Sequence, residues 1–400
     1  MRVCCNTDNG GYIIRDGEKI FLDDIGDIHE YYNLPAYKEI RAQMLLGERP
    51  LVCSKCYEAE DQGGTSIRQS FIQEYAESEE FLKHFASTHP DGHLDELRIE
   101  YFDVALSNSC NIKCMMCSPV NSDQLIADFD ALNIPYNKER VALASSWGLS
   151  IDPLLAAWDK MLPSLQKCLI TGGEPLINKL HLSLLDRAVE TGDASHITLM
   201  YHSNLMKLPE RVLERWKQFK HVDLHVSLEG FSELNDYIRY GSVWGRIVEN
   251  IHRLLALRDQ GEISLSIEFH TVFQASNCLG LTDLFKFLMT LPGVPALPYP
   301  IWLDHPSWHM VENLPREIKL EAMDRLERFW TDNQQQLSWG RFANWNQEKY
   351  QMVHSHMERA LAAKGYQDRF QRWQQELHDF QLLRGNSLGE ILPEMRQFNL

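Results

Sequence analysis

The sequence lacks a long apolar run, an excess of basic residues, and any internal repeat or low-complexity tract. No apolar run approaches the roughly 20 residues that a bilayer-spanning helix needs, and Met1–Cys5 do not resemble a secretory signal. Acidic residues outnumber basic ones by 56 to 39, which disfavours a nonspecific nucleic-acid binder and an anionic membrane surface. We therefore expect a cytoplasmic protein with no membrane partner, for which nucleic acid is a disfavoured partner.

The nine cysteines do not form an even set, as a complete disulfide framework would require. Without an export signal, and with several cysteines closely spaced, we interpret them as thiols of a reducing cytosol. Cys168 and Cys278 have no neighbouring cysteine. Cys168 lies in an apolar run, so it is predicted to be a buried hydrophobic residue.

The 400 residues are long enough for one full core and accessory modules. Residues 1–75 hold two cysteine pairs, and the charged stretch 76–95 is predicted to be a linker. Residues 96–304 alternate strand-like and helix-like patterns. Residues 305–400 are rich in helix formers and aromatics, and they are predicted to form a helical extension that packs on the preceding part.

Strand–helix alternation over 96–304 predicts an α/β fold with a parallel sheet and right-handed crossovers. Six such units suit a partial (β/α)6 TIM-like barrel. The expected strands are 97–106, 167–171, 196–201, 222–228, 264–272 and 298–303, and helical patterns cover 180–189, 209–219 and 244–258.

The most informative motif is C-x3-C-x2-C at Cys110, Cys114 and Cys117. Three thiolates at this spacing can hold three irons of a [4Fe–4S] cluster and leave the fourth iron open to a ligand. A zinc site would want a fourth ligand nearby, and no Cys or His follows within twenty residues of Cys117. The polar neighbours of these cysteines argue against inert core thiols.

A second motif, Gly172-Gly173-Glu174-Pro175, follows the apolar run 168–170 and precedes a helical pattern. It therefore falls at the carboxyl end of a predicted strand, where barrel-type α/β folds place their ligands. Two glycines allow close backbone approach, and a carboxylate offsets an ammonium charge.

Together the two motifs resemble the radical S-adenosylmethionine (SAM) superfamily. The resemblance implies that the open iron chelates SAM and cleaves it reductively to a 5′-deoxyadenosyl radical. It also implies a role for polar residues at successive strand ends, although each alone is more often a turn or capping residue. The residues it marks for SAM are Met116, Gly172, Gly173, Glu174, Ser203, Asn204, Ser227, Arg239 and Asn277.

The second cysteine set comprises Cys4, Cys5, Cys53 and Cys56. Two pairs at long separation are compatible with a zinc ribbon, a redox disulfide or a second iron–sulfur cluster. The region resembles the auxiliary-cluster part of twitch-domain-containing radical SAM proteins, which favours an auxiliary cluster, expected to be [4Fe–4S]. Segments that carry this resemblance are Gly47–Pro50, Glu60–Ser66, Arg68, Tyr237–Trp244, Pro306, Leu314-Pro315, Arg384-Gly385 and Pro393-Glu394.

Members of that family commonly carry a further cysteine upstream of the Cys4-Cys5 pair, and the sequence has none there. The auxiliary cluster would then use both Cys4 and Cys5, or one of them with a non-cysteine ligand. An open iron that binds substrate is the third possibility.

The resemblance implies an oxidoreductase that takes an electron from an external donor of the flavodoxin or ferredoxin type. It would abstract hydrogen from a peptide or small molecule, and the auxiliary cluster would accept an electron or anchor the substrate. Two other classes are an enzyme that modifies tRNA or another nucleic acid, and a non-catalytic metal-binding protein. The acidic balance disfavours the first, and the intact motifs disfavour the second.

Trp308 and His309 follow the last predicted strand. A loop with these side chains is expected either to line the substrate pocket at the barrel mouth or to pack under the C-terminal helices.

Overall fold

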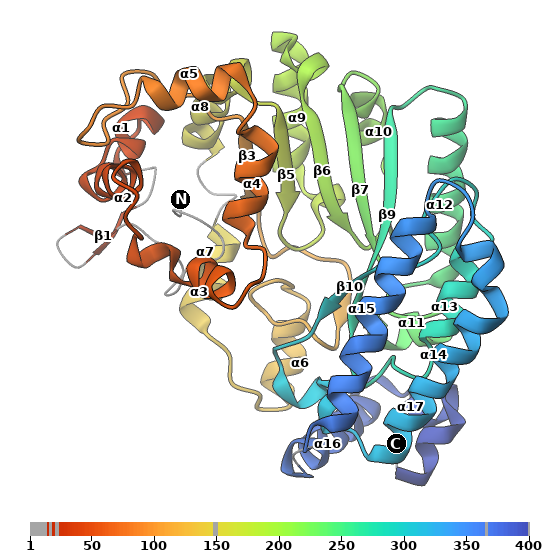
Figure 1. The fold of residues 1–400 in the computed structure, drawn as a ribbon. Helices are drawn as coiled ribbons and strands as arrows, with labels where there is room; N and C mark the ends of the chain where they lie inside the picture. The colour runs from red at the N-terminus through yellow and green to blue at the C-terminus, as the bar shows by residue number, and fades with distance from the viewer. Residues whose placement is uncertain (1–13, 16–17, 21–23, 147–150, 365–366, 399–400) are drawn as a thin grey trace. The chain divides into compact units, whose positions relative to one another are not determined.

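The chain folds into two units, which are described separately. The computed structural model describes residues 14–15, 18–20, 24–146, 151–364 and 367–398 (Figure 1). One unit comprises residues 1–100 together with 150–165, and the other comprises 101–149 together with 166–400. Among the described residues we find no helix with both the length and the apolarity that a bilayer crossing requires.

The larger unit is built on a six-stranded, all-parallel sheet that curls into a half-barrel (Figure 1). The strand order is β10-β9-β7-β6-β5-β3, so consecutive strands of the barrel are neighbours in space. This confirms the predicted partial barrel and all six of its strands. The strands are β3 (Tyr101–Ala105), β5 (Lys167–Thr171), β6 (Thr198–Ser203), β7 (His221–Ser227), β9 (Leu265–Phe273) and β10 (Tyr299–Trp302).

Helices connect the strands, as the sequence predicts. Helix α9 begins after Asn178, whose side chain accepts the Leu180 N–H at 2.8 Å, and ends at Gly192, which takes the left-handed conformation with φ of 84°. The connecting helices are α9 (Lys179–Thr191), α10 (Glu210–Trp216), α11 (Glu233–Ile238), α12 (Trp244–Asp259) and α13 (Leu281–Leu288).

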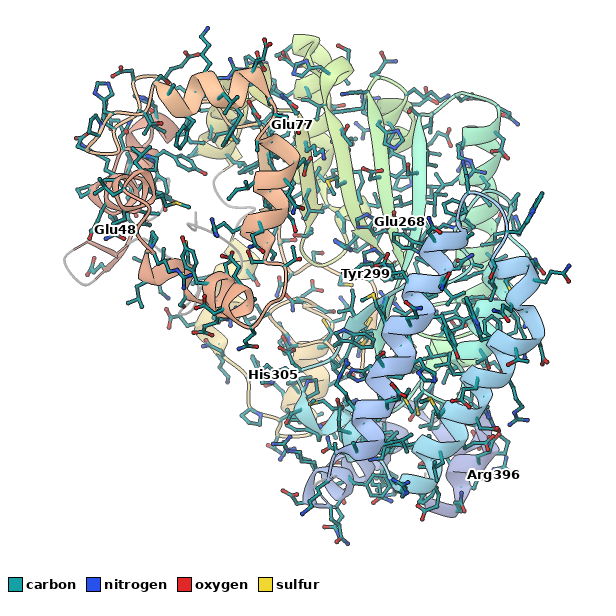
Figure 2. The ribbon with its side chains drawn as sticks, viewed as in Figure 1. Glu48, Glu77, Glu268, Tyr299, His305 and Arg396 are labelled. Atoms are coloured by element: carbon teal, nitrogen blue, oxygen red, sulfur yellow. The ribbon has the colours of Figure 1, made fainter. Side chains whose placement is uncertain are left out.

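The strands alternate between a fully buried face and a partly buried face. In β7, Val222, Leu224 and Val226 are buried, while His225 and Ser227 are only partly buried. Parallel sheets covered on both faces usually show continuous apolar runs, so this alternation marks a face that polar groups occupy. We call this face, which includes Glu268 of β9 and Tyr299 of β10, the inner face (Figure 2).

The C-terminal part is helical, as predicted. It shares one buried cluster with α11 and α13, and Trp373 and Phe380 are among its buried side chains. Its helices are α14 (Arg316–Leu337), α15 (Ala343–Ala362), α16 (Gln367–Arg384) and α17 (Leu388–Ile391) (Figure 1).

The smaller unit consists mainly of short helices. Helix α5 lies in the stretch that the sequence predicts to be a linker. The helix is stabilised by Ser78, which caps its first turn, and by Phe81 and Phe85, whose rings stack on one another. Residues 150–165 belong to this unit, and the Ile99 N–H donates to Ser164 Oγ at 3.1 Å. Its elements are β1 (Ile14–Arg15), β2 (Glu18–Lys19), α1 (Ile28–Tyr32), α2 (Pro35–Leu45), η3 (Leu51–Cys53), α3 (Ser54–Asp61), α4 (Ile67–Tyr75), α5 (Glu79–Ala86), α8 (Ile151–Met161) and η4 (Leu162–Ser164).

Candidate metal centre

The three motif cysteines lie on the loop that follows β3, at the carboxyl edge of the sheet. A two-residue strand in this loop, β4 (Lys113–Cys114), pairs antiparallel with β8 (Arg239–Tyr240), and Cys114 lies opposite Arg239. The Met115 N–H also donates to the Ile238 carbonyl at 2.9 Å. A segment more than a hundred residues away in sequence therefore fixes the middle cysteine.

The glycine pair packs directly against the cysteine loop. The Glu174 N–H donates to the Ser109 carbonyl at 2.8 Å, and Gly172 and Gly173 have φ of 87° and 48°. A Cβ on Gly172 would lie 2.7 Å from the Ser107 oxygen, and one on Gly173 would lie 2.0 Å from the Ser109 oxygen. Both positions therefore require glycine, on conformational and on steric grounds.

The loop closes on itself through polar side chains. Asp123 accepts the Cys110 N–H at 3.1 Å, and Asn108 donates to the Pro119 carbonyl at 3.0 Å. Ser122 donates to the Ile112 carbonyl at 2.9 Å. Because these bonds are buried or partly buried, they hold the loop in one shape and set the directions of the thiols.

The three thiols fit a cationic group that is bound by several sulfurs. Burial raises the pKa of Cys114 to about 12 and that of Cys117 to about 11, and it also raises the pKa of Cys110. Each thiol would therefore stay protonated at neutral pH unless a metal replaces the proton.

Arg239 places an unsatisfied donor beside the cysteine loop. Its Nη1 donates to Glu229 Oε1 at 2.8 Å, and its side chain is 10% exposed. Its Nε is buried and has no hydrogen-bond partner among the described residues. Because buried donors are normally paired, this N–H fits an acceptor such as a ligand carboxylate, in line with its predicted role toward SAM.

The sequence predicts no role for Glu229, yet its carboxylate joins several parts of the site. Its second oxygen accepts the Val272 N–H at 2.8 Å, so it joins the ends of β7 and β9. Burial raises its pKa to about 7, while Arg239 opposes that shift. A glutamate just past the end of β7 was the available signal, but its partner lies ten residues further on and becomes adjacent only in the fold.

Glu174 is buried, and its carboxylate is occupied by internal donors. Ser203 Oγ donates to it at 2.8 Å, and the Asn204 N–H donates at 2.7 Å. The Leu176 N–H donates at 3.2 Å. Burial raises the pKa of this carboxyl group. Glu174 therefore fixes the end of β6 through these hydrogen bonds. Its contact with SAM stays a prediction.

Asn204 joins the end of β6 to the cysteine loop. Its Nδ2 donates to Asn111 Oδ1 at 2.9 Å and lies 4.0 Å from Cys110 Sγ. Its Oδ1 accepts the Met206 N–H at 2.9 Å. One predicted SAM residue, Asn204, is thus brought to the cysteine motif, while Ser203 contacts Glu174.

The remaining predicted SAM residues take different positions. Ser227 ends β7 on the inner face. Asn277 is fully buried. Its side-chain oxygen accepts the Gln274 N–H at 3.0 Å, and its side-chain nitrogen donates to the Val272 carbonyl at 2.9 Å and to the Glu229 carbonyl at 3.0 Å, so it joins its own loop to the end of β7. Met116 packs against the buried hydrophobic cluster that the C-terminal helices share with α11 and α13. Contacts of these three residues with SAM stay predictions.

Trp308 and His309 are both held by Glu376 of α16. Trp308 Nε1 donates to Glu376 Oε2 at 2.6 Å, and His309 Nε2 lies 2.9 Å from Oε1. Arg372 lies 4.0 Å above the Trp308 ring, and His309 is fully buried. These contacts favour the packing interpretation, and the substrate-pocket role stays a prediction.

The second cysteine set is described only in part, because Cys4 and Cys5 lie outside the described residues. Cys53 ends η3, and Cys56 is buried in α3. Polar residues predicted to mark this region meet around α3. Glu60 pairs with Arg68 at 2.6 Å and accepts from Ser66 Oγ at 2.5 Å, while Arg49 pairs with Asp61 and, like Arg68, lies over the Tyr57 ring.

Comparison with known proteins yields only distant likenesses. No known family profile matches the chain, and no curated protein matches it in sequence. Among solved structures it is similar to Streptococcus suis SuiB bound to S-adenosylmethionine, with 14% identity over 80% of this chain and 65% of that chain, at a TM-score of 0.36. It is also similar to SuiB bound to the precursor peptide SuiA, with 13% identity over 80% and 66% of the two chains, at a TM-score of 0.37.

A further likeness is to native anSMEcpe with bound AdoMet and Cp18Cys peptide, with 12% identity over 59% of this chain and 61% of that chain, at a TM-score of 0.38. The matches span less than two thirds of the length of the SuiB and anSMEcpe chains. At these scores, the functional assignment depends on the residues of the site itself.

Proposed function

We propose that this protein is a radical SAM enzyme. More narrowly, it is an oxidoreductase with one auxiliary iron–sulfur cluster that acts on a peptide or a small molecule. The observation that carries the proposal is one juxtaposition: Cys110, Cys114 and Cys117 lie on the loop after β3, and Gly172-Gly173 at the end of β5 pack against that loop. In parallel α/β folds this carboxyl edge is where ligands bind.

When bound, a [4Fe–4S] cluster and SAM would together supply a one-electron reductive cleavage that yields the 5′-deoxyadenosyl radical. The chain's own share is to bind and to orient. The three thiolates would hold the cluster, and their raised pKa values mean that binding releases protons. Arg239 Nε would donate to the carboxylate of SAM, since a guanidinium suits a carboxylate.

The half-barrel also shapes the space in which a radical must react. Glu174 and Glu229 each tie two strand ends together, at β5–β6 and β7–β9. Rigid strand ends keep reacting groups in position and keep water away from them. The inner face beyond these ends would receive the substrate.

The auxiliary cluster is the finer part of the proposal. Cys56 is buried in α3, and Cys53 lies three residues before it, so both sit on a single local framework. Further ligands would come from outside the described residues. The cluster would take an electron from the product radical or anchor the substrate, and an external donor of the flavodoxin or ferredoxin type would reduce the first cluster.

Anaerobic reconstitution and an assay for 5′-deoxyadenosine test the proposal. Replacing Cys110, Cys114 and Cys117 with Ala should abolish reductive SAM cleavage and remove about four irons per chain. Cys168→Ala is the matched control, because it removes a thiol in β5 that the proposal does not use. Undiminished cleavage in the triple variant would refute the assignment.

A further inference from the structure

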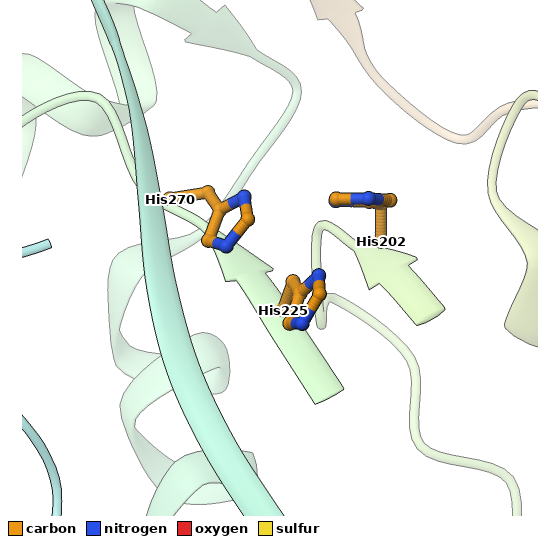
Figure 3. A group of neighbouring side chains, drawn as sticks. All are labelled: His202, His225 and His270. Carbon is orange, nitrogen blue, oxygen red and sulfur yellow. The ribbon is translucent and has the colours of Figure 1, made fainter. Parts of the chain in front are cut away.

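Three histidines converge on the inner face of the half-barrel. His202 lies in β6, His225 in β7 and His270 in β9 (Figure 3). Each offers a ring nitrogen, and the three nitrogens lie within 4.8 Å of one another. None of them belongs to the cysteine motif or to the predicted SAM residues.

The curl of the sheet brings these rings together. His202 pairs in register with His225, but β6 and β9 are not neighbours, because β7 lies between them. Strands two apart in a flat sheet are separated by about 9–10 Å. The rings of His202 and His270 are nevertheless 5.2 Å apart, so the side chains lean toward one point on the concave side.

Simple packing does not account for these side chains. Barrel interiors are usually filled by branched apolar residues, and buried polar atoms are usually hydrogen-bonded. Here Nδ1 of His225 and both ring nitrogens of His270 are buried with no hydrogen-bond partner among the described residues. The side chain of His270 is 11% exposed, so these nitrogens are out of contact with bulk water.

The electrostatics favour neutral imidazoles, which is the form that binds metals. Burial, with repulsion from the other two rings, holds the pKa of His202 at about 4. Burial and His270 also lower the pKa of His225. At neutral pH, both rings would therefore offer a lone pair without first losing a proton.

One carboxylate accompanies the three rings. Glu268 Oε2 lies 3.8 Å from His270 Nε2, and its position in β9 is in register with His225. Tyr299 of β10 stacks on His270 with the ring centres 5.3 Å apart. Lys349 of α15 pairs with Glu348 at 2.7 Å and lies over the Tyr299 ring. Interaction with His270, with the charge of Lys349 as a smaller cause, lowers the pKa of Glu268. The ionised Glu268 is placed to offset a cation or to join its ligands.

We propose that His202, His225 and His270 together bind one divalent first-row transition-metal ion of the zinc class. Imidazole nitrogens suit such ions and bind zinc at about 2.0–2.1 Å. The rings of His225 and His270 are now nearly parallel, with 13° between their planes, and they would turn toward the ion. Three protein ligands leave a coordination position open toward the interior of the half-barrel, where a nitrogen or oxygen of a substrate, or water, would bind.

This inference is independent of the proposed radical chemistry, since none of its ligands is a cysteine or a predicted SAM residue. The test uses the full chain with its iron–sulfur sites reconstituted anaerobically, equilibrated with zinc. Zinc per chain is counted by mass spectrometry, and zinc-edge X-ray absorption reports which atoms surround the metal. We expect one zinc per chain with imidazole nitrogens at about 2.0–2.1 Å.

The variants are His202→Ala, His225→Ala and His270→Asn, with His252→Ala as the matched control because His252 is exposed on α12. Each of the three variants at His202, His225 or His270 should bind zinc at least about tenfold more weakly, consistent with loss of one ligand. The His252→Ala control should bind zinc as the parent protein does. All four variants should keep 5′-deoxyadenosine formation, which separates this site from the proposed function.

Three results would overturn the site. The first is absence of zinc from the parent protein. The second is zinc surrounded by sulfur at about 2.3 Å. The third is unchanged zinc content when all three histidines are replaced. The absorption measurement on the parent protein needs no variant, so a misfolded substitution does not block the test.

Discussion

The two cysteine regions differ in what holds them. The loop of Cys110, Cys114 and Cys117 is fixed by distant parts of the chain: the glycine pair after β5, Asn204 after β6, and the β8 strand that pairs with Cys114. Cys53 and Cys56 instead lie on adjoining short helices, surrounded by the charged side chains of the same stretch. The first geometry depends on the complete fold, whereas the second depends mainly on local structure.

The largest effect should come from Gly173→Ala. Its Cβ would lie 2.0 Å from the Ser109 oxygen at φ of 48°, and a left-handed conformation with overpacking costs about 2–5 kcal/mol. We expect loss of SAM cleavage and of about four irons per chain. Gly192→Ala is the control: it has φ of 84° with open space around it, so it should cost about 1–2 kcal/mol and keep its iron.

If Gly173→Ala retains both iron and cleavage, the glycine pair does not position the cysteine loop. The conclusion that the geometry of the Cys110–Cys117 loop depends on the complete fold would then be contradicted.

The second-largest effect should come from Cys53→Ala with Cys56→Ala. Because these residues lie on a local framework, we expect a loss of up to about four irons with SAM cleavage retained. Substrate turnover should be lost. Iron and sulfide counts before and after substitution measure this, and zinc without sulfide in a chain lacking the first three cysteines would make the auxiliary centre a zinc site.

Glu229→Gln should destabilise the protein, although it removes none of the cysteines that are proposed to bind a cluster. It leaves the buried Arg239 guanidinium without its carboxylate, and breaking such a pair costs about 3 kcal/mol. Urea unfolding measures the loss. Glu233→Gln, on the exposed surface of α11, should change stability by less than about 0.5 kcal/mol.

The same substitution should change how stability depends on pH. The pKa of Glu229 is raised to about 7 in the folded protein from a model-peptide value of 4.5, so the folded state holds a proton that the unfolded state releases. That contribution is present below about pH 4.5 and is lost as pH rises through about 7. The parent should therefore lose more stability than Glu229→Gln across this interval, and parallel curves would show that Glu229 is ionised throughout.

The smallest effect should come from Trp308→Phe, which keeps an aromatic ring but removes the bond to Glu376. A hydrogen bond to a charged group contributes about 1.5–3 kcal/mol. We expect a loss in that range, with SAM cleavage and substrate turnover reduced together if the residue only packs. A selective fall in turnover, with cleavage intact, would instead assign Trp308 to the substrate pocket.

The sequence predicts the strands well because each is a short apolar run or an alternating one between helical patterns. The alternation in β7 even places His225 on the face opposite Val222 and Val226. The convergence of three histidines could not be predicted, since it depends on the curl of the sheet and on the register between strands. The β4–β8 pairing could not be predicted, because two-residue strands leave no periodic signal. The Arg239–Glu229 pair could not be predicted either, because its two side chains become adjacent only in the fold.

The stretch 76–95 shows a different limit. Its charges favour a linker, yet Ser78 caps α5 and the phenylalanines Phe81 and Phe85 share one side of it. Cys168, by contrast, is buried in β5 as expected, because its apolar neighbours gave a direct signal.

The smaller unit is discontinuous in sequence, and this has a consequence for synthesis. Residues 150–165 complete it, and the Ser164 hydroxyl accepts the Ile99 N–H. Chains leave the ribosome from the N-terminus and domains generally fold as units. Cys110, Cys114 and Cys117 therefore emerge before the first unit can close, while the glycine pair emerges just after it. A nascent chain stalled near residue 150 would present the loop of Cys110, Cys114 and Cys117 with neither the finished unit before it nor the strand end against which it packs.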